Sequence, residues 1–318
     1  MKILVFGIGV LGSYLTHELL KAGHEVTAFA RGQRYTDLQN NGLVIQHVKQ
    51  KRKTIDKISV INHLDEHDEY DIIFVVLQKS QLFEALPLLA KITSKRIAFI
   101  GNNGKIEETL TDFRRMSTAN PKLLFGFISC AGRRDGITIH NWHTNKGRMV
   151  IAPFEKDSQT EAFITKLLDG TDIQPILKND ISAWLKHHSA MITPLALAIQ
   201  CESTAGRNLR KSQALLIAVN ATIEAIQMFE RQDIRNEPPH SKRLMNWPAK
   251  RWRWILARLL ATKTGKIMAI DHSRAAIGEI DLLAQELLDY SKRYQYPLPS
   301  LEKLYRMAKE KNARNLKS

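Results

Sequence analysis

Three glycines near the N-terminus have the spacing G-x-G-x-x-G. The full motif comprises Gly7, Ile8, Gly9, Val10, Leu11 and Gly12. An apolar run over residues 2–6 precedes it, and a stretch of helical character, Val10–Ala22, continues from it. In such a strand–turn–helix context the first glycine permits a tight turn, the second lets a pyrophosphate approach, and the third lets helix and strand pack closely. The free amides of the helix N-terminus favour phosphate, so the motif predicts a dinucleotide site.

The residues after the second predicted strand indicate which nicotinamide cofactor would bind. In folds of this kind an acidic residue there accepts hydrogen bonds from a ribose 2′-hydroxyl, whereas a basic residue accommodates a 2′-phosphate. Arg31 follows the predicted strand Glu25–Ala30, and Arg34 comes three residues later. A guanidinium binds phosphate through two parallel hydrogen bonds. The sequence therefore predicts NADP(H), the alternative being that both arginines are solvated loop charges.

The bulk composition is that of a globular protein of more than one domain. The chain has 318 residues, a formal net charge of +15 and two cysteines, Cys130 and Cys201. Two distant cysteines make no disulfide framework, so a reducing cytoplasm is expected. We expect no membrane span, because no apolar run approaches the ~18–20 residues that one needs. The basic charge favours acidic partners, such as a phosphate-rich cofactor or nucleic acid, without choosing between them.

Strand and helix patterns alternate through the first half of the chain. The clearest strands are expected at residues 2–6, 25–30, 71–77, 96–100 and 123–130, with a helix at about 80–91. This alternation is typical of a parallel sheet built from β-α-β units. We further expect Leu43–Val48 and Lys57–Ile61 to form a hairpin or a pair of edge strands. We expect Ile137–His143 and Gly147–Ala152 to form an antiparallel pair that closes the sheet.

Long amphipathic segments replace this alternation after about residue 180. They are Ile181–Cys201, Ser212–Gln232, Trp252–Thr262, Ala275–Arg293 and Leu301–Asn312. The change is expected near Asp172–Asp180, where Pro175 interrupts the pattern. The predicted fold is therefore α/β, with a nucleotide-binding domain at residues 1–178 and an all-helical domain for substrate binding or dimerisation at 179–318.

Taken together, these motifs resemble those of the ketopantoate reductase (2-dehydropantoate 2-reductase) family. Several pieces match in order over nearly the full length, and their order and spacing are more specific than any one of them. Besides the glycine motif and Arg31, they are Asn103-Gly104, Gly132-Arg133-Arg134-Asp135-Gly136, Trp184-Leu185-Lys186, Glu279-Ile280-Asp281 and the closing segment Pro297–Tyr305.

The resemblance implies an N-terminal Rossmann-type domain, a helical C-terminal domain, a cleft between them, and hydride transfer from NADPH to a 2-oxo acid. The resemblance makes Lys186 the proton donor and places Asn103 beside the nicotinamide and the substrate. It also implies that Glu279 lies near the cofactor and the substrate, and that Gly132 lies in a turn that contacts the cofactor. The chemistry fits, because hydride delivered to a carbonyl carbon builds negative charge on oxygen. A positioned ammonium stabilises that charge and then supplies the proton.

The chain departs from the family mainly where substrate would bind. The resemblance implies asparagines one and two turns after the lysine, but here Ala190 stands four residues after Lys186, and Thr193 directly precedes Pro194. Neighbouring polar residues are candidate replacement donors: His187, His188 and Ser189. A site without donors for a substrate hydroxyl cannot strongly select for it. We therefore expect a less polar 2-oxo compound, and leave a role in pantothenate biosynthesis open.

Two further signals are assigned no chemistry. The stretch His63-Leu-Asp-Glu-His67 has metal-ligand residue types at helical spacing, but it lies in a polar connector, and we predict no metal site. The segment 240–266 has eight Lys or Arg, no acidic residue, and three tryptophans, Trp247, Trp252 and Trp254. We interpret it as an outer helix whose tryptophans pack inward or into a homodimer interface. The alternative is binding of nucleic acid or a membrane surface.

The sequence therefore predicts a cytoplasmic, NADPH-dependent reductase that converts a 2-oxo acid to a 2-hydroxy acid. The alternative is a catalytically weak NADP(H)-binding protein of the same family that engages a partner through its basic helical domain.

Overall fold

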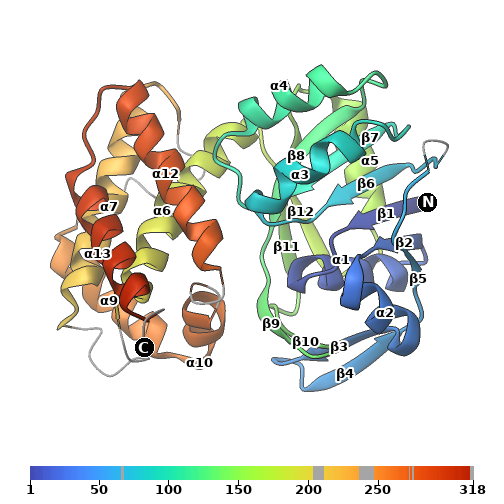
Figure 1. Ribbon diagram of the computed structural model, residues 1–318, viewed down its shortest axis with the longest axis horizontal. Coiled ribbons are helices and arrows are strands. Elements are labelled where there is room, and N and C mark those ends of the chain that lie inside the picture. The colour runs from blue at the N-terminus through green and yellow to red at the C-terminus, as the bar shows by residue number, and fades with distance from the viewer. Residues whose placement is uncertain (66–67, 203–210, 236–246, 272, 274–275, 316–318) are drawn as a thin grey trace. The chain divides into compact units, whose positions relative to one another are not determined.

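The computed structural model describes residues 1–318 except 66–67, 203–210, 236–246, 272, 274–275 and 316–318. The chain divides into two compact units. The first unit comprises Met1–Asn102 and Ile106–Ile181, and the second comprises Asn103–Lys105 and Ser182–Ser318. The first unit is α/β and the described part of the second is helical (Figure 1), so the predicted fold class is confirmed.

The first unit is built on an eight-stranded sheet with the strand order β12-β11-β8-β7-β6-β1-β2-β5. Neighbouring strands run parallel except β11, which pairs antiparallel with β8. The strands are β1 (Lys2–Phe6), β2 (Glu25–Phe29), β5 (Ser59–Ile61), β6 (Ile72–Val75), β7 (Arg96–Ile100), β8 (Lys122–Ile128), β11 (Gly147–Pro153) and β12 (Ile173–Leu177).

Five helices belong to this unit: α1 (Val10–Lys21), α2 (Gly32–Asn41), α3 (Lys79–Leu89), α4 (Ile106–Met116) and α5 (Ser158–Leu167). Local sequence explains their ends. Asp157 caps α5, and its side chain accepts a hydrogen bond from the amide of Gln159 at 3.1 Å. Gly23 follows α1 with φ +80°, a left-handed conformation that glycine adopts without strain.

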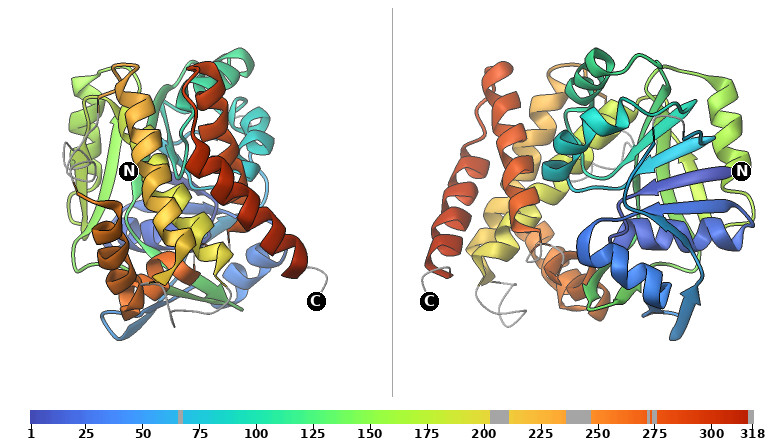
Figure 2. Two further views of the ribbon diagram at one scale, coloured as in Figure 1. Left: turned by 90° about the vertical axis from the view of Figure 1, so that its left-hand side faces the viewer. Right: turned by 45° about the vertical axis from the view of Figure 1, so that its right-hand side comes forward.

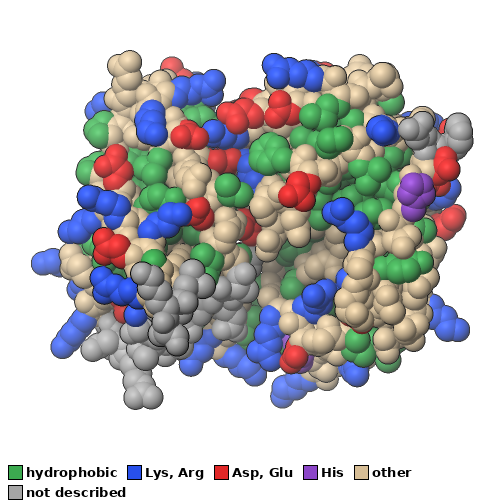
Figure 3. All heavy atoms as spheres, viewed as in Figure 1, with side chains coloured by type: hydrophobic (Ala, Val, Ile, Leu, Met, Phe, Trp, Pro, Cys, Tyr) green, Lys and Arg blue, Asp and Glu red, His purple; other side chains and the backbone are tan. Residues whose placement is uncertain are grey.

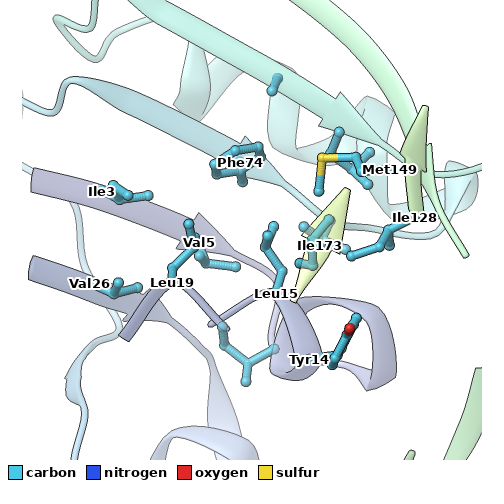
Figure 4. Close-up of a cluster of buried hydrophobic side chains, with 14 of the residues drawn as sticks. Ile3, Val5, Tyr14, Leu15, Leu19, Val26, Phe74, Ile128, Met149 and Ile173 are labelled. Atoms are coloured by element: carbon cyan, nitrogen blue, oxygen red, sulfur yellow. The ribbon is translucent and has the colours of Figure 1, made fainter. Parts of the chain in front are cut away.

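The core of the first unit lies where α1 packs on the central strands. Figure 4 shows Ile3 and Val5 of β1 directed toward Leu15 and Leu19 of α1. All four of these side chains have no exposed surface. Burial of this kind contributes about 1.5–3 kcal/mol for each large apolar side chain. The continuous apolar runs that predicted the central strands are therefore explained by burial on both faces of the sheet.

A second sheet of four strands has the order β4-β3-β10-β9, and α1 packs against it as well as against β1 and β2. In Figure 1 this sheet lies below α1. Its strands are β3 (Leu43–His47), β4 (Arg52–Asp56), β9 (Ala131–Asp135) and β10 (Thr138–Trp142).

The second sheet corrects two predicted pairings. The strand at Leu43–Val48 pairs with β4, not with Lys57–Ile61, because the chain turns early at Lys51, where φ is +52°. The strand β5 instead joins the edge of the main sheet beside β2. The predicted pairing of Ile137–His143 with Gly147–Ala152 is also wrong, since β10 pairs with β9 and β3, and β11 pairs with β8. Both β4 and β9 are mainly polar and exposed, so they carry no clear apolar signal.

The segment predicted as a change of pattern, Asp172–Asp180, contains a further strand. Residues Ile173–Leu177 form β12, which pairs with β11 at the edge of the main sheet. Proline is tolerated on an edge strand because its missing amide needs no partner there, and this explains Pro175.

The second unit is built from helices around its own apolar core. They are α6 (Ile181–Cys201), α7 (Gln213–Glu230), α9 (Ala249–Ala261), α10 (Lys263–Gly265), the π-helical turn η3 (Lys266–Asp271), α12 (Ile277–Arg293) and α13 (Pro299–Asn315). The helix α13 packs along α7, as the left view in Figure 2 shows, and α7 also packs against α9. The five predicted amphipathic segments thus correspond to α6, α7, α9, α12 and α13.

Between α1 and the second sheet lies a cluster of three buried histidines. His17 contacts Asp56 at 2.8 Å, and its ring lies 4.9 Å from that of His47. His47 in turn bonds His143 at 3.2 Å through ring nitrogens. Burial lowers the pKa of His47 to about 4, and it also lowers the pKa of His143. These two rings are therefore neutral in the folded protein at pH 7.

We expect this cluster to make the fold acid-sensitive. The pKa of His47 is about 4 in the folded protein and about 6.5 in the unfolded chain. At pH values well above 6.5 the ring is neutral in both states, so its titration does not reduce the free energy of unfolding. Below that pH the unfolded chain binds a proton that the folded protein excludes. His47 alone should lower the free energy of unfolding by about 2 kcal/mol between pH 7 and pH 5.

His47→Gln should reduce this pH dependence, measured by urea unfolding at the two pH values. His63→Gln, at an exposed position, is the matched control. An unchanged slope in His47→Gln would contradict the assignment.

Candidate functional site

The glycine motif forms a turn in which two of the three glycines are fixed by close contacts. Gly7 has φ +106°, and a Cβ there would lie 2.8 Å from the side chain of Leu77. A Cβ on Gly12 would overlap the carbonyl oxygen of Gly7. Around Gly9, by contrast, no atom of the described residues lies within 4 Å of a Cβ position. The turn therefore packs closely on the protein side and leaves open space at its middle glycine.

The N-terminus of α1 opens onto this space. Gly9 is the N-cap residue and provides no side chain to bond the first amides of the helix. The first turn carries no acidic residue. Uncapped amides and the positive end of the helix dipole attract an anion, so the residues present fit the diphosphate of a dinucleotide. That Gly7, Ile8, Gly9, Val10, Leu11 and Gly12 contact a cofactor stays a prediction.

The two arginines after β2 have different environments. Arg31 is exposed and is the N-cap residue of α2, directly beyond the end of β2. Arg34 is buried, with 8% of its surface exposed, and its guanidinium bonds Ile8 and Ser13 within the same unit. The interpretation of Arg34 as a solvated loop charge is therefore wrong, while Arg31 remains available to a ligand.

Two further residues lie in this unit. Gly132 lies within β9, where a Cβ would overlap the carbonyl oxygen of His140 on the paired strand. Strand pairing alone therefore explains this glycine, and a cofactor contact stays a prediction.

Lys79, to which no role was assigned from the sequence, begins α3 just beyond β6 and is only 4% exposed.

In the second unit Lys186 lies on a polar stripe of α6. It is 5% exposed, its ammonium donates to the hydroxyl of Ser182, and it lies 5.8 Å from the centre of the Tyr290 ring. Ser189 and Thr193 continue the stripe, with their hydroxyl oxygens 3.4 Å apart. The helical spacing of 3.6 residues brings these side chains to one face.

The short loop of residues 103–105 lies against this part of the unit. Asn103 is buried, and its side-chain oxygen accepts a hydrogen bond from the amide of Lys105 at 3.2 Å. The hydroxyl of Tyr290 donates to the carbonyl of Gly104 at 3.0 Å. Tyr290 therefore contacts both the loop of Asn103 and the ammonium of Lys186, and so brings together two residues that the sequence analysis assigned to one site.

An acidic residue that the sequence analysis did not consider also adjoins this loop. A carboxylate oxygen of Glu286 lies 3.3 Å from a Cβ position on Gly104, and Ser189 lies 3.7 Å from the same point. Glu286 is 7% exposed and precedes Tyr290 by one turn of α12. No motif in the sequence distinguished it, because only the phase of α12 relative to the loop brings it there.

The predicted acid Glu279 is in the first turn of α12 and is 6% exposed. It precedes Tyr290 by eleven residues, which corresponds to about 16 Å along a helix axis. Its catalytic and cofactor-binding roles stay predictions.

The positions where the family carries asparagines differ from each other in environment. Ala190 is fully buried and belongs to the apolar core of the second unit, whereas Thr193 lies on the polar stripe. Of the candidate replacement donors, His187 bonds the carbonyl of Ala183 at 2.8 Å, and His188 stacks on Trp184, with burial lowering its pKa to about 4. Ser189 adjoins the loop of residues 103–105, where its Cβ lies 3.7 Å from a Cβ position on Gly104.

The basic, tryptophan-rich segment 240–266 is described from residue 247 onward. Trp247 and Trp254 are 47% and 48% exposed, so neither ring is packed into the described core of the second unit. A dimer interface there stays a prediction. Lys and Arg side chains occur over both units on the face that Figure 3 shows.

Two further points concern a metal site and a membrane span. Within the described ranges, no three or more His, Cys, Asp or Glu side chains are grouped to hold a metal ion, and Glu66 and His67 of the His63–His67 stretch lie outside those ranges. A search of the helices in the described part of the chain found none with the length and hydropathy of a membrane span.

Comparison with known proteins found a family model that matches the N-terminal part of the chain. Residues 3–156 match the family model described as ketopantoate reductase PanE/ApbA, which confirms the resemblance inferred from the motifs. The comparison with curated proteins gave no match.

Solved structures share the fold over the whole chain. A ternary structure of D-mandelate dehydrogenase with NADH and anilino(oxo)acetate has a TM-score of 0.79 at 13% identity, covering 99% of both chains. A PanE/ApbA family ketopantoate reductase from Ralstonia eutropha JMP134 has a TM-score of 0.76 at 16% identity, again covering 99% of both. A probable 2-dehydropantoate 2-reductase from Bacillus subtilis has 0.70 at 18%, covering 98% of this chain and 100% of that one.

The geometry of the glycine turn predicts that two similar substitutions have unequal effects on stability. Gly12→Ala should lower the free energy of unfolding by about 2 kcal/mol or more, because its methyl group must displace the backbone of Gly7. Gly9→Ala should change it by less than about 1 kcal/mol, since its methyl group enters open space. Denaturant unfolding followed by circular dichroism measures both, and equal losses would contradict the described turn.

Proposed function

We propose that this chain is an NADPH-dependent oxidoreductase that reduces a 2-oxo acid to a 2-hydroxy acid, because residues 3–156 match the ketopantoate reductase family model. The observation that carries this proposal is the uncapped N-terminus of α1, with open space at Gly9, in a unit of that family. It supports binding of a dinucleotide diphosphate. The cofactor, when bound, supplies the hydride.

The choice of NADPH rests on Arg31. Its exposed side chain stands at the end of β2, where an acidic residue would favour NADH. D-mandelate dehydrogenase, which shares the fold, is a structure with NADH, so the fold by itself accommodates either cofactor. We propose that Arg31 binds the 2′-phosphate as a bidentate pair.

Lys186 is proposed as the proton donor. Its ammonium would stabilise the negative charge that develops on the substrate carbonyl oxygen and then transfer a proton to it. The hydrogen bond to Ser182 and the ring of Tyr290 restrict where that ammonium can lie. Asn103 would donate and accept beside the substrate and nicotinamide, and Glu279 would orient a substrate hydroxyl or the cofactor.

The substrate is proposed to be less polar than ketopantoate. Ala190 replaces a hydrogen-bonding residue with a methyl group that belongs to the apolar core. Only the hydroxyls of Ser189 and Thr193 continue the stripe beyond Lys186. The ligand of the D-mandelate dehydrogenase structure, anilino(oxo)acetate, carries an aromatic group next to its oxo acid, so this fold holds such compounds in at least one protein.

The deciding experiment follows NADPH oxidation against a panel of 2-oxo acids that includes ketopantoate and aryl-substituted oxo acids. Wild-type protein should turn over at least one member. Lys186→Ala should lower kcat by about 10²- to 10⁴-fold, because it removes the proton donor. Lys292→Ala, at an exposed position of α12, is the control and should leave kcat unchanged. Equal activity of Lys186→Ala and wild type would remove Lys186 from the mechanism.

The same assay tests the second candidate function, a catalytically weak NADP(H)-binding protein that engages a partner. The replacement of a polar family position by Ala190 favours this candidate. Tight NADPH binding without turnover of any panel member would support it over the reductase.

A second measurement tests the cofactor assignment. Arg31→Ala should weaken NADPH binding by about 10- to 100-fold, because a charge-assisted pair to phosphate contributes roughly 1.5–3 kcal/mol. Binding of NADH, which has no 2′-phosphate, should change by less than about threefold. Isothermal titration of both cofactors measures the ratio, and equal losses would refute the phosphate assignment.

A further inference from the structure

Arg34 is a buried cation that the proposed chemistry does not use. It belongs to α2, yet its guanidinium reaches three segments that are distant in sequence. Nε donates to the carbonyl of Ile8 at 3.1 Å, Nη2 donates to the hydroxyl of Ser13 at 3.3 Å, and Nη1 donates to the carbonyl of Ile137 at 3.4 Å. Each nitrogen of the planar group therefore has its own acceptor.

The positions of the three acceptors show which segments the side chain of Arg34 links. Ile8 is the residue between the first two glycines of the motif, and Ser13 lies in the first turn of α1. Ile137 lies in the turn between β9 and β10 of the second sheet. One side chain therefore joins the middle of the glycine turn to the helix that follows it, and joins both to the neighbouring sheet.

Burial makes this arrangement costly. Burial and the nearby charge of Arg134 lower the pKa of Arg34 to about 10, so its charged form is less favourable than in water. A buried arginine persists only where its donors are satisfied with good geometry. The three hydrogen bonds therefore explain how a charged arginine side chain is accommodated at this buried position.

We propose that Arg34 is a positioning residue for cofactor binding, which fixes the carbonyl of Ile8 so that the amides at the N-terminus of α1 keep the orientation a diphosphate needs. This inference rests on the proposed function, since it concerns the same dinucleotide. It assigns the two arginines after β2 separate roles. Arg31 contacts the 2′-phosphate, whereas Arg34 acts through the turn and does not distinguish NADPH from NADH.

The test compares four probes on one set of proteins by isothermal titration. The probes are NADPH, NADH, ADP-ribose, which keeps the diphosphate, and 2′-AMP, which has the 2′-phosphate alone. The variants are Arg34→Lys, which keeps the charge but cannot reproduce the planar fork, Arg34→Met, and Arg31→Ala. Arg115→Met, at an exposed position of α4, is the matched control.

Arg34→Lys should weaken NADPH, NADH and ADP-ribose by a common factor of about ten and leave the NADPH to NADH ratio and 2′-AMP binding unchanged. Arg34→Met should show the same pattern with a larger factor. Arg31→Ala should instead weaken NADPH and 2′-AMP and spare the other two. A merely structural Arg34 would lower the melting temperature of Arg34→Lys without changing the affinity of its folded form, and that result would overturn the inference.

Two more outcomes would overturn it. A selective loss of NADPH and 2′-AMP in Arg34→Lys would make Arg34 a direct phosphate ligand. Unchanged affinities for all four probes would remove it from cofactor binding while leaving the proposed function intact. Failure of wild-type protein to bind NADPH or ADP-ribose would refute the proposed function, and this inference with it.

Discussion

The close approach of α1 to the turn that follows β1 is the constraint on which the proposed nucleotide site depends. Gly12 has no room for a side chain because the carbonyl of Gly7 occupies that position. With the helix held there, Leu15 and Leu19 enter the core of the first unit beside Ile3 and Val5. The N-terminus of α1 is left without a side-chain cap, next to the open space at Gly9. Core packing and the proposed anion site therefore depend on the same backbone contact.

The fold could be predicted from the sequence wherever burial produced a clear pattern of apolar residues. The strand β6 is apolar throughout, and β1 and β7 are apolar after their first residues, because both faces are covered. Such runs have few other interpretations. The second sheet was paired wrongly because β4 and β9 are edge strands. Residues such as Arg52 and Arg134 face solvent there, and hydrogen bonds rather than apolar contacts determine the pairing. Strand partners at polar edges depend on turns such as the one at Lys51, which a hydrophobic pattern does not encode.

The candidate site was predictable to a lesser degree. The glycine motif is local in sequence, so its turn could be predicted from spacing. Lys186 and Asn103 came only from the family resemblance, since most lysines and asparagines are solvated. Tyr290 and Glu286, which adjoin the loop of Asn103, could not be found from sequence, because their position depends on the rotation of α12 about its axis. Residues that act through tertiary contacts carry no local pattern.

The two arginines after β2 show why residue type alone does not decide a role. Arg31 and Arg34 lie three residues apart, yet Arg31 is the exposed N-cap residue of α2, whereas Arg34 is buried in the first turn of that helix. A buried guanidinium that already donates to three acceptors has little capacity left to recognise a phosphate. An exposed one gains most of its hydrogen bonds only when a ligand arrives. This contrast is the reason for proposing that the exposed arginine selects for a 2′-phosphate and that the buried one fixes the shape of the turn.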